Sequence, residues 1–273
     1  FNPTSDAIAV ADLPLLDRWM LQRTAEVMDE ITEAFEGYEF FRFFQLLQNF
    51  CVTDLSNFYL DIAKDRLYVS APQDKRRRSC QTVMALIIER LAGFIAPVLC
   101  HMAEDIWQNL PYRVQETSVF QRGWPSAPTE WRNDTLTAPV QQLRDLRAAV
   151  NKVLEDCRGR QELGASLEAA VRIEARSPEM QAALSWLSDN ADPEVDGLRD
   201  WLLVSQLQLG GEPWAEVLAS QEDATAVIDV SRARGTKCDR CWHYEADVGQ
   251  HADHPDLCGR CVGVLERRTH QLA

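Results

Sequence analysis

Two cysteine pairs near the end of the chain restrict its fold more than any other feature. They are Cys238 with Cys241 and Cys258 with Cys261, each spaced C-x-x-C, and 16 residues separate the two pairs. Such a pair folds into a tight knuckle that directs two thiolates at one point, and this spacing is typical of tetrahedral zinc sites. Four cysteines leave no open coordination position. We therefore expect one structural Zn²⁺, whose binding energy stabilises a tail too short to build its own core.

Other uses of these cysteines are a redox dithiol pair, disulfide bonds or an iron site. Paired C-x-x-C motifs in a chain without secretory features favour a metal ion. The tail also contains four histidines, which are alternative metal ligands: His243, His251, His254 and His270. The other cysteines stand singly in apolar helical contexts, where free cysteine is usually buried. They are Cys51, Cys80, Cys100 and Cys157.

Most of the chain before this tail has the periodicity of amphipathic helices, because apolar residues recur three and four positions apart. These segments are 12–36, 39–66, 75–110 and about 134–158. Pro97 lies inside the third segment, where we expect a kink. Long helices with short connections predict a helical bundle. We expect the irregular segment 112–132, which contains tryptophan and proline, to pack against it.

The period changes after the fourth helix. Residues 169–173 alternate as in a half-buried strand, 178–188 have a helical pattern, and 201–209 and 224–230 predict two more strands. The predicted fold class is therefore mainly α: a helical bundle, a small α+β unit and a four-cysteine zinc knuckle tail. The predicted domains are 1–136 (bundle), 137–232 (long helix and α+β junction unit) and 233–273 (zinc-binding tail).

The net charge of −14 argues at first against a polyanionic partner. The acid excess is uneven, however: residues 1–70 have a net charge of −7 and residues 138–230 of −9, whereas 71–137 and 231–273 each have +1. Binding follows the local potential, so nucleic acid would use the two near-neutral stretches. Only four lysines accompany 24 arginines. Arginine makes forked contacts to phosphate and guanine that lysine cannot make, although a composition bias of the source genome is the alternative explanation.

A basic run, Lys75–Arg78, opens the third helix. It could hold phosphate near the helix N-terminus, where backbone amides add to the attraction, or it could be a solvated charged face. The preceding helix ends with Asp61, Lys64, Asp65 and Arg66, which fit an ordinary ladder of ion pairs as well as a part of the same surface.

Catalytic signatures are absent from the sequence. It contains no G-x-G-x-x-G, no phosphate-binding G-x-x-x-x-G-K-[ST] and no H-E-x-x-H, and only His101 precedes residue 243. No residue set resembles a nucleophile with its base. The chain has no long apolar run and no signal peptide, so we expect a cytoplasmic protein without a membrane span. It begins at Phe1 rather than methionine, and we expect it to be a fragment of a longer or processed chain.

Seven short motifs follow one another along the chain. They are Leu16-Asp17-Arg18-Trp19; Phe58–Ile62 with Lys64-Asp65-Arg66 and Tyr68; Arg77–Thr82; Ser118-Val119-Phe120 with Trp124-Pro125; Val150–Val153; Ser166–Val171; and Lys237–Tyr244 with Cys258–Cys261. Through these motifs the chain resembles the C-terminal part of bacterial-type isoleucyl-tRNA synthetases, a class I family. Valyl, leucyl and methionyl enzymes share such a bundle, whereas the Cys-Trp-His-Tyr knuckle with its second pair is specific to the isoleucyl branch.

The resemblance implies a tRNA-binding role. The bundle would be the anticodon-binding domain, and the α+β unit and zinc tail would help to hold the anticodon end of isoleucine tRNA. Cys238, Cys241, Cys258 and Cys261 match the family's zinc-ligand positions. The family's ATP-binding signatures and editing domain are absent here. ATP and Mg²⁺ would therefore act only in a catalytic core outside this chain, which alone we expect to be an inactive monomer.

Anticodon recognition generally uses splayed bases that stack on aromatic or arginine planes. The residues predicted to contact tRNA are Lys64, Arg66, Lys75, Arg76, Arg77, Arg78, Arg240, Trp242 and His243. The alternative for Trp242, His243 and Tyr244 is packing around the zinc knuckle. Two other functions fit the sequence: an acidic zinc-containing module for protein interaction, and a free-standing paralogue of the synthetase fragment.

Overall fold

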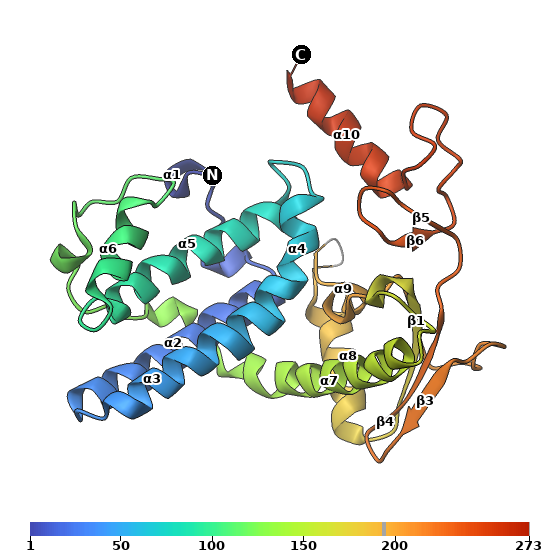
Figure 1. Ribbon diagram of the computed structural model, residues 1–273, viewed down its shortest axis with the longest axis horizontal. Coiled ribbons are helices and arrows are strands. Elements are labelled where there is room, and N and C mark those ends of the chain that lie inside the picture. Colours follow the sequence, from blue (N-terminus) through green and yellow to red (C-terminus); the bar gives the residue numbers. More distant parts are fainter. Residues whose placement is uncertain (193–194, 273) are drawn as a thin grey trace. The chain divides into compact units, whose positions relative to one another are not determined.

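The computed structural model describes residues 1–192 and 195–272, and this part of the chain divides into two compact units (Figure 1). Unit 1 contains Phe1–Leu67 and Pro72–Asp134, and unit 2 contains Tyr68–Ala71 and the chain from Thr135 onward. The sequence placed its first boundary after residue 136, close to this division. The segments 137–232 and 233–273, which the sequence treats as two domains, lie together in unit 2.

Unit 1 is helical. Its main elements are α1 (Pro3–Asp6), α2 (Leu15–Glu36), α3 (Phe40–Asn49), the π-helical stretch η2 (Phe50–Leu60), α4 (Asp61–Tyr68, whose last residue lies in unit 2), α5 (Lys75–Ile95) and α6 (Cys100–Gln108), with short 3₁₀ turns at Val10–Asp12, Val119–Gln121 and Thr129–Trp131. In the described part of the chain, no helix is long and apolar enough to cross a membrane.

Helix α2 follows the predicted amphipathic pattern. Leu16, Trp19, Met20, Val27 and Ile31 are all buried, and they recur at helical spacing. The helix ends at Gly37, whose amide donates to the Glu33 carbonyl at 2.9 Å. Tyr38 then adopts a left-handed backbone conformation (φ 57°) that turns the chain into α3.

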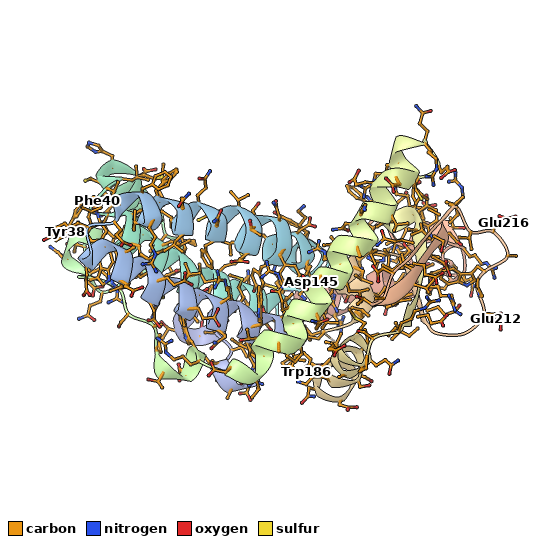
Figure 2. The ribbon with its side chains drawn as sticks, turned by 90° about the horizontal axis from the view of Figure 1, so that it is seen from below. Tyr38, Phe40, Asp145, Trp186, Glu212 and Glu216 are labelled. Carbon is orange, nitrogen blue, oxygen red and sulfur yellow. The ribbon has the colours of Figure 1, made fainter. Side chains whose placement is uncertain are left out.

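The second predicted helix is continuous, but its hydrogen-bond pattern changes along its length. Residues 40–68 stay helical, but Phe50–Leu60 form π-helical bonds between α3 and α4. Phe43 and Phe50 are buried as expected, whereas Phe40 and Phe44 are 52% and 55% exposed. Phe40 lies with Tyr38 at the tip of the α2–α3 hairpin (Figure 2). The apolar pattern of the sequence extends to this tip, where the side chains stay exposed.

The third predicted helix is two helices. Helix α5 stops at Ile95 and α6 starts at Cys100, so Pro97 marks a break and not only a kink. Segment 112–132 packs on the bundle as predicted. Trp124 donates its indole N–H to Thr32 Oγ1 at 2.9 Å, and Trp131 is buried beneath the Arg90 guanidinium, 5.0 Å from the ring centre.

A buried ion pair joins α2 to α4. Arg66 Nη1 lies 2.8 Å from Asp17 Oδ2, and both side chains are almost completely buried. The Tyr59 hydroxyl donates to Asp17 Oδ1 at 2.5 Å. Burial, followed by the nearby Asp17 carboxylate, raises the pKa of Tyr59 well above its usual range and that of Cys80 to about 12. Both groups therefore stay neutral inside unit 1, and Asp17 is the counter-ion of Arg66.

Unit 2 combines helices with two sheets. Its elements are α7 (Thr137–Gly159), β1 (Ala169–Ala175), α8 (Pro178–Asn190), α9 (Leu198–Leu202), β2 (Gln206–Leu209), β3 (Ala219–Glu222), β4 (Ala226–Arg232), β5 (Thr236–Lys237), β6 (Tyr244–Glu245) and α10 (Gly259–Leu272). The larger sheet has the order β2-β1-β4-β3, in which only the β1–β2 pair is parallel; β5 and β6 form an antiparallel pair.

One face of the larger sheet is apolar and faces helices. Val171, Ile173, Ile228 and Val230 share this face by register and are buried. Helix α7 contacts β3 and β4, and α8 contacts β1. Ser177 caps α8, because its hydroxyl accepts from the Met180 amide at 3.1 Å.

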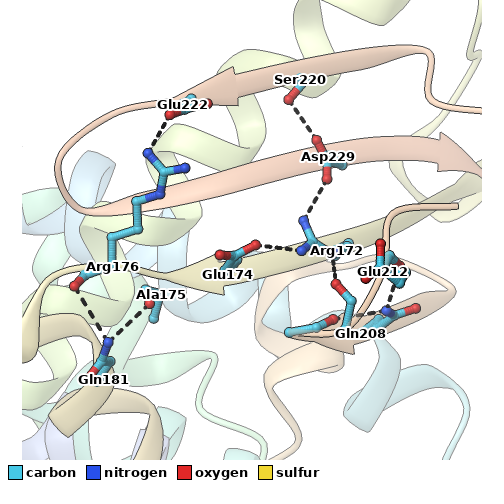
Figure 3. A network of polar contacts seen from close by, with 12 residues as sticks. Arg172, Glu174, Ala175, Arg176, Gln181, Gln208, Glu212, Ser220, Glu222 and Asp229 are labelled. Atoms are coloured by element: carbon cyan, nitrogen blue, oxygen red, sulfur yellow. Dashed lines mark hydrogen bonds and ion pairs between the residues drawn. The ribbon is translucent and has the colours of Figure 1, made fainter.

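The opposite face of this sheet is mostly polar (Figure 3). Arg172 lies 2.8 Å from Asp229 and donates to the Gly211 carbonyl at 2.8 Å, while Ser220 donates to Asp229 at 2.6 Å. The Gly211 contact brings the β2–β3 loop against this face. Arg172 is only 5% exposed, so this network buries a second arginine with its carboxylate partner.

The strand predictions were partly wrong. Residues 201–209 were predicted as one strand, but the run begins inside α9 and only Gln206–Leu209 pair as β2. Leu203 has a left-handed conformation (φ 55°) that ends α9, and a short apolar run does not distinguish a buried helix turn from a strand. The strand predicted at 224–230 is β4, shifted to 226–232, and the polar strand β3 was missed.

The Asp17–Arg66 pair generates a stability prediction. Replacing Asp17 with Asn leaves the buried Arg66 charge without a counter-ion, and we expect the free energy of unfolding to fall by about 3–5 kcal/mol. The matched control is Asp61→Asn, which removes an exposed pair with Lys64 and should cost less than about 1 kcal/mol. Urea unfolding followed by circular dichroism measures both, and similar losses in the two variants would contradict the prediction.

Candidate metal centre and nucleic-acid interface

The four predicted cysteines converge in unit 2. Cys238, Cys241, Cys258 and Cys261 are all buried, and their Sγ atoms lie within 4.8 Å of one another. The Cys241 and Cys258 sulfurs are 3.7 Å apart. A tetrahedral zinc ion with Zn–S bonds of about 2.3 Å places its sulfurs about 3.8 Å apart, so the cluster has the dimensions of such a site.

The first knuckle is shaped by its backbone. The Trp242 amide donates to the Cys238 carbonyl at 2.9 Å, and the Cys238 amide donates to the His243 carbonyl at 2.9 Å. Trp242 has a left-handed conformation (φ 67°), which closes the turn between β5 and β6. Gly235 precedes the knuckle at φ +99°, and a Cβ there would lie 2.5 Å from the Glu245 carbonyl oxygen, so only glycine fits.

The second knuckle opens helix α10. The Cys258 amide approaches Cys238 Sγ at 3.3 Å, and the Gly259 amide donates to Asp247 Oδ2 at 2.7 Å. A Cβ at position 259 would lie 2.7 Å from the same carboxylate oxygen. The glycine therefore allows Asp247 to fix the start of α10 beside the cluster.

Burial and the neighbouring sulfurs separate the pKa values of three of the clustered thiols. Burial raises the pKa of Cys258 to about 11, and a hydrogen bond with Cys241 together with burial raises the pKa of Cys261. The Cys261 thiol in turn lowers the pKa of Cys241 to about 4. A divalent cation at the cluster would favour the thiolate form of its ligands.

The cluster has a small apolar shell. Val69, Val248 and Leu257 pack against the cysteines, and Arg240 Nη2 donates to the Val69 carbonyl at 2.6 Å. Val69 belongs to the short segment 68–71 between α4 and α5, which is therefore part of unit 2. No sequence signal near residue 69 indicates this contact, because it joins positions 171 residues apart.

The basic run is divided between paired and unpaired arginines. Arg76 lies 3.3 Å from Asp65, and Arg78 lies 3.3 Å from Asp6 and stacks on the Phe1 ring at 5.8 Å. Lys75 is exposed and Arg77 half-buried. Within residues 1–192 and 195–272, Arg77 forms no ion pair and no side-chain hydrogen bond. Carboxylates therefore neutralise two of the three arginines in this run.

Two predicted tRNA contacts are contradicted by burial. Arg66 is the buried partner of Asp17 in α2, rather than an exposed member of the ladder expected at 61–66. His243 is only 4% exposed and packs inside the knuckle, which is the alternative that the sequence left open. Neither side chain can reach RNA without opening its unit. Lys64 remains exposed, with an ion pair to Asp61 at 2.8 Å.

The other two predicted contacts in the tail differ in accessibility. Trp242 is 60% exposed, whereas Arg240 is held by the Val69 carbonyl. Lys237, which is not among the predicted tRNA contacts, places its Nζ 5.6 Å from the centre of the Trp242 ring. The spacing Lys-x₄-Trp across a knuckle was the signal that could have identified this pair.

Two protein-family models match the chain. The anticodon-binding domain of tRNA ligase matches residues 17–173, and a zinc finger found in FPG and IleRS matches residues 235–263. The first match covers more than half of the chain and the second contains all four clustered cysteines.

Whole-chain similarity points to the same proteins. The chain is 89% identical over 272 residues to an isoleucine–tRNA ligase of Parasynechococcus marenigrum (strain WH8102), covering 100% of this chain and 28% of that protein. It is 75% identical to the enzyme of Synechococcus sp. (strain CC9311) and 73% identical to that of Prochlorococcus marinus (strain MIT 9313), each over 98% of this chain and 28% of the relative. The chain thus spans about 28% of the length of these relatives.

A helical bundle followed by a small sheet and a four-cysteine knuckle combines an anticodon-binding module of tRNA ligases with a zinc-finger module. The chain belongs to the family of anticodon-binding domains of tRNA ligases, and it matches the C-terminal part of isoleucine–tRNA ligases.

The cysteine cluster generates a metal prediction. We expect one zinc ion per chain by elemental mass spectrometry, and we expect Cys261→Ser to lose it, because three ligands cannot close the tetrahedron. The matched control is Cys100→Ser, an exposed cysteine outside the cluster, which should keep the metal. Iron in place of zinc, or full zinc retention in Cys261→Ser, would contradict the assignment.

Proposed function

We propose that this chain is the tRNA-binding C-terminal portion of an isoleucine–tRNA ligase, and that it positions the anticodon end of isoleucine tRNA. The family match over residues 17–173 carries this proposal, because it assigns anticodon binding to the helical part of the chain. The most similar relatives described above are isoleucine–tRNA ligases, and they supply the amino acid.

We also propose that Cys238, Cys241, Cys258 and Cys261 hold one structural Zn²⁺. The ion would cross-link the two knuckles. The chain's own residues determine the backbone around the ion. Gly235 and Gly259 allow the close turns, and Asp247 fixes the start of α10. The ion has no position left for a substrate, so its role is to hold Trp242 and its surroundings in place.

The accessible part of the predicted tRNA surface is smaller than the sequence suggested. Lys64, Lys75, Arg77 and Trp242 remain candidates by their exposure, and Lys64 also pairs with Asp61. Arg76, Arg78 and Arg240 are available only if RNA displaces the partners described above. Lysine and arginine would contact phosphates, and Trp242 offers a ring on which an unpaired base can stack.

Aminoacylation itself belongs to the rest of the ligase in this proposal. ATP and Mg²⁺ would bind the catalytic core, and this chain would contribute affinity and orientation for the tRNA. We place the protein in the cytoplasm, where tRNA charging takes place, and expect it to act as a monomer.

The proposal predicts a salt-dependent interaction. We expect the chain to bind an isoleucine tRNA transcript with an affinity that falls as salt rises, because each phosphate contact releases counter-ions. The double variant Lys75→Gln/Arg77→Gln should lower the slope of log K against log salt by about two. Fluorescence anisotropy across a salt series provides both quantities.

The matched control for this experiment is Arg42→Gln. Arg42 is exposed but lies between Glu33 and Glu39, at 3.0 and 3.1 Å, so its removal should leave the slope unchanged. An undetectable interaction between the unaltered chain and isoleucine tRNA at low salt would refute the proposed function.

A further inference from the structure

A pocket opens at one end of the polar face of the larger sheet. It has a volume of about 360 Å³, within the range of roughly 300–1,000 Å³ that small-ligand sites occupy. Its floor comes from β1, β2 and β4, one wall from the β2–β3 loop and the other from the residues that follow β4. The residues used below are Gln206, Trp214, Glu216, Ser231, Arg232 and Arg234. All of them belong to unit 2.

The floor contains a buried hydroxyl without a protein partner. Ser231 pairs with Ala170 in the sheet register, on the same face as Asp229 and Arg172. Its side chain is 4% exposed, and within the described residues its Oγ has no hydrogen-bond partner. The other polar groups nearby on this face, Arg172 and Asp229, are bonded to each other. Buried polar groups in proteins are normally hydrogen-bonded, so a ligand or an ordered water in the pocket is expected to bond to this hydroxyl.

The wall after β4 carries an arginine without an ion pair. Arg234 is exposed and forms no ion pair in the described part of the chain. The side-chain oxygen of Gln206 accepts from the Arg234 backbone amide at 3.1 Å, and the side-chain nitrogen of Gln206 donates to the Arg234 carbonyl at 2.9 Å. These two bonds fix the backbone of Arg234 to β2. Arg232, the last residue of β4, also lines the pocket, but the register places its side chain on the apolar face, where the hydrogen bond from Arg160 and then the charge of Arg232 lower the pKa of Glu162.

The opposite wall supplies an aromatic ring and one carboxylate. Trp214 is half-exposed in the β2–β3 loop, and Glu216 follows it on the outer side of unit 2 (Figure 2). An indole face, a forked cation and a small hydroxyl are the groups with which proteins bind unpaired nucleotides. Glu216 disfavours a phosphate next to it but can accept a hydrogen bond from the amino group of a base.

We propose that this pocket binds one unpaired nucleotide of tRNA, with its base between Trp214 and Ser231 and its phosphate at Arg234. The orientation follows from the charges, because Glu216 repels phosphate from the loop side and Arg234 attracts it to the strand end. The inference rests on the proposed tRNA-binding function and adds a site that is separate from the cysteine knuckle.

The test is tRNA binding by tryptophan variants of the 273-residue chain in its zinc-containing form. With a fluorescent isoleucine tRNA transcript, Trp214→Ala should bind at least about tenfold more weakly, because a stacked base is lost. Trp214→Phe should retain most of the affinity, since it keeps an aromatic face. The matched control is Trp186→Ala, a half-exposed tryptophan of unit 2 outside the pocket, which should bind like the unaltered chain.

Two further measurements keep the test decisive if Trp214→Ala does not fold. The arginine variant Arg234→Gln should reduce the salt slope by about one. Photo-cross-linking of the unaltered chain to 4-thiouridine-substituted tRNA should label a peptide that contains Trp214 or Arg232–Arg234.

The outcomes separate the two proposals. Normal affinity and salt slope in the pocket variants, with tight binding by the unaltered chain, would overturn the pocket but leave the tRNA-binding function intact. No binding by the unaltered chain would overturn both. Equal losses in Trp214→Ala and Trp186→Ala would show a general loss of structure rather than a lost stacking contact, and would also overturn the pocket if the arginine variant kept its slope.

Discussion

The pairing of arginine with carboxylate is the interaction on which both units depend. Unit 1 buries Arg66 with Asp17 between α2 and α4, and unit 2 buries Arg172 with Asp229 at the middle of its larger sheet. Each pair carries enough desolvation cost that losing one partner leaves an unstable buried charge. A chain with 28 basic and 42 acidic residues can satisfy such arginines many times over. The acid excess is therefore part of how the fold holds its arginines.

The parts of the structure that could be predicted from the sequence are those with a local sequence signal. Helix periodicity is local, and the predicted helices correspond to α2, the segment 40–68, α5 with α6, and α7. The cysteine convergence was equally accessible, because C-x-x-C fixes two ligands within one turn and metal-site spacing relates the two turns. In both cases the information lies within a short stretch of sequence.

The partners and the burial of individual charged residues could not be predicted from such local signals. Arg66 looked like an exposed helix residue, but its partner Asp17 lies 49 positions away, and Arg78 finds Asp6 near the chain start. His243 is buried because the knuckle turns it inward, which the Cys-Trp-His-Tyr motif alone does not reveal. The α9 turn was missed for a related reason: Leu203 must adopt a left-handed conformation, and leucine gives no signal for it. Tertiary contacts and backbone turns, rather than composition, decide these positions.

The same pairing limits where RNA can be held. An arginine that is paired with a carboxylate binds a phosphate only if that pair breaks. The cations available to RNA are therefore those that form no ion pair in the folded chain. In the described residues these include Arg77 in the stretch 71–137 and Arg234 in the stretch 231–273, the two stretches whose net charge is +1. The acidic stretches repel the backbone of any RNA that does not place a phosphate at these points. A few uncommitted arginines on an otherwise acidic chain therefore favour a selective contact over a strong general attraction, because affinity then depends on matching fixed positions rather than on total charge.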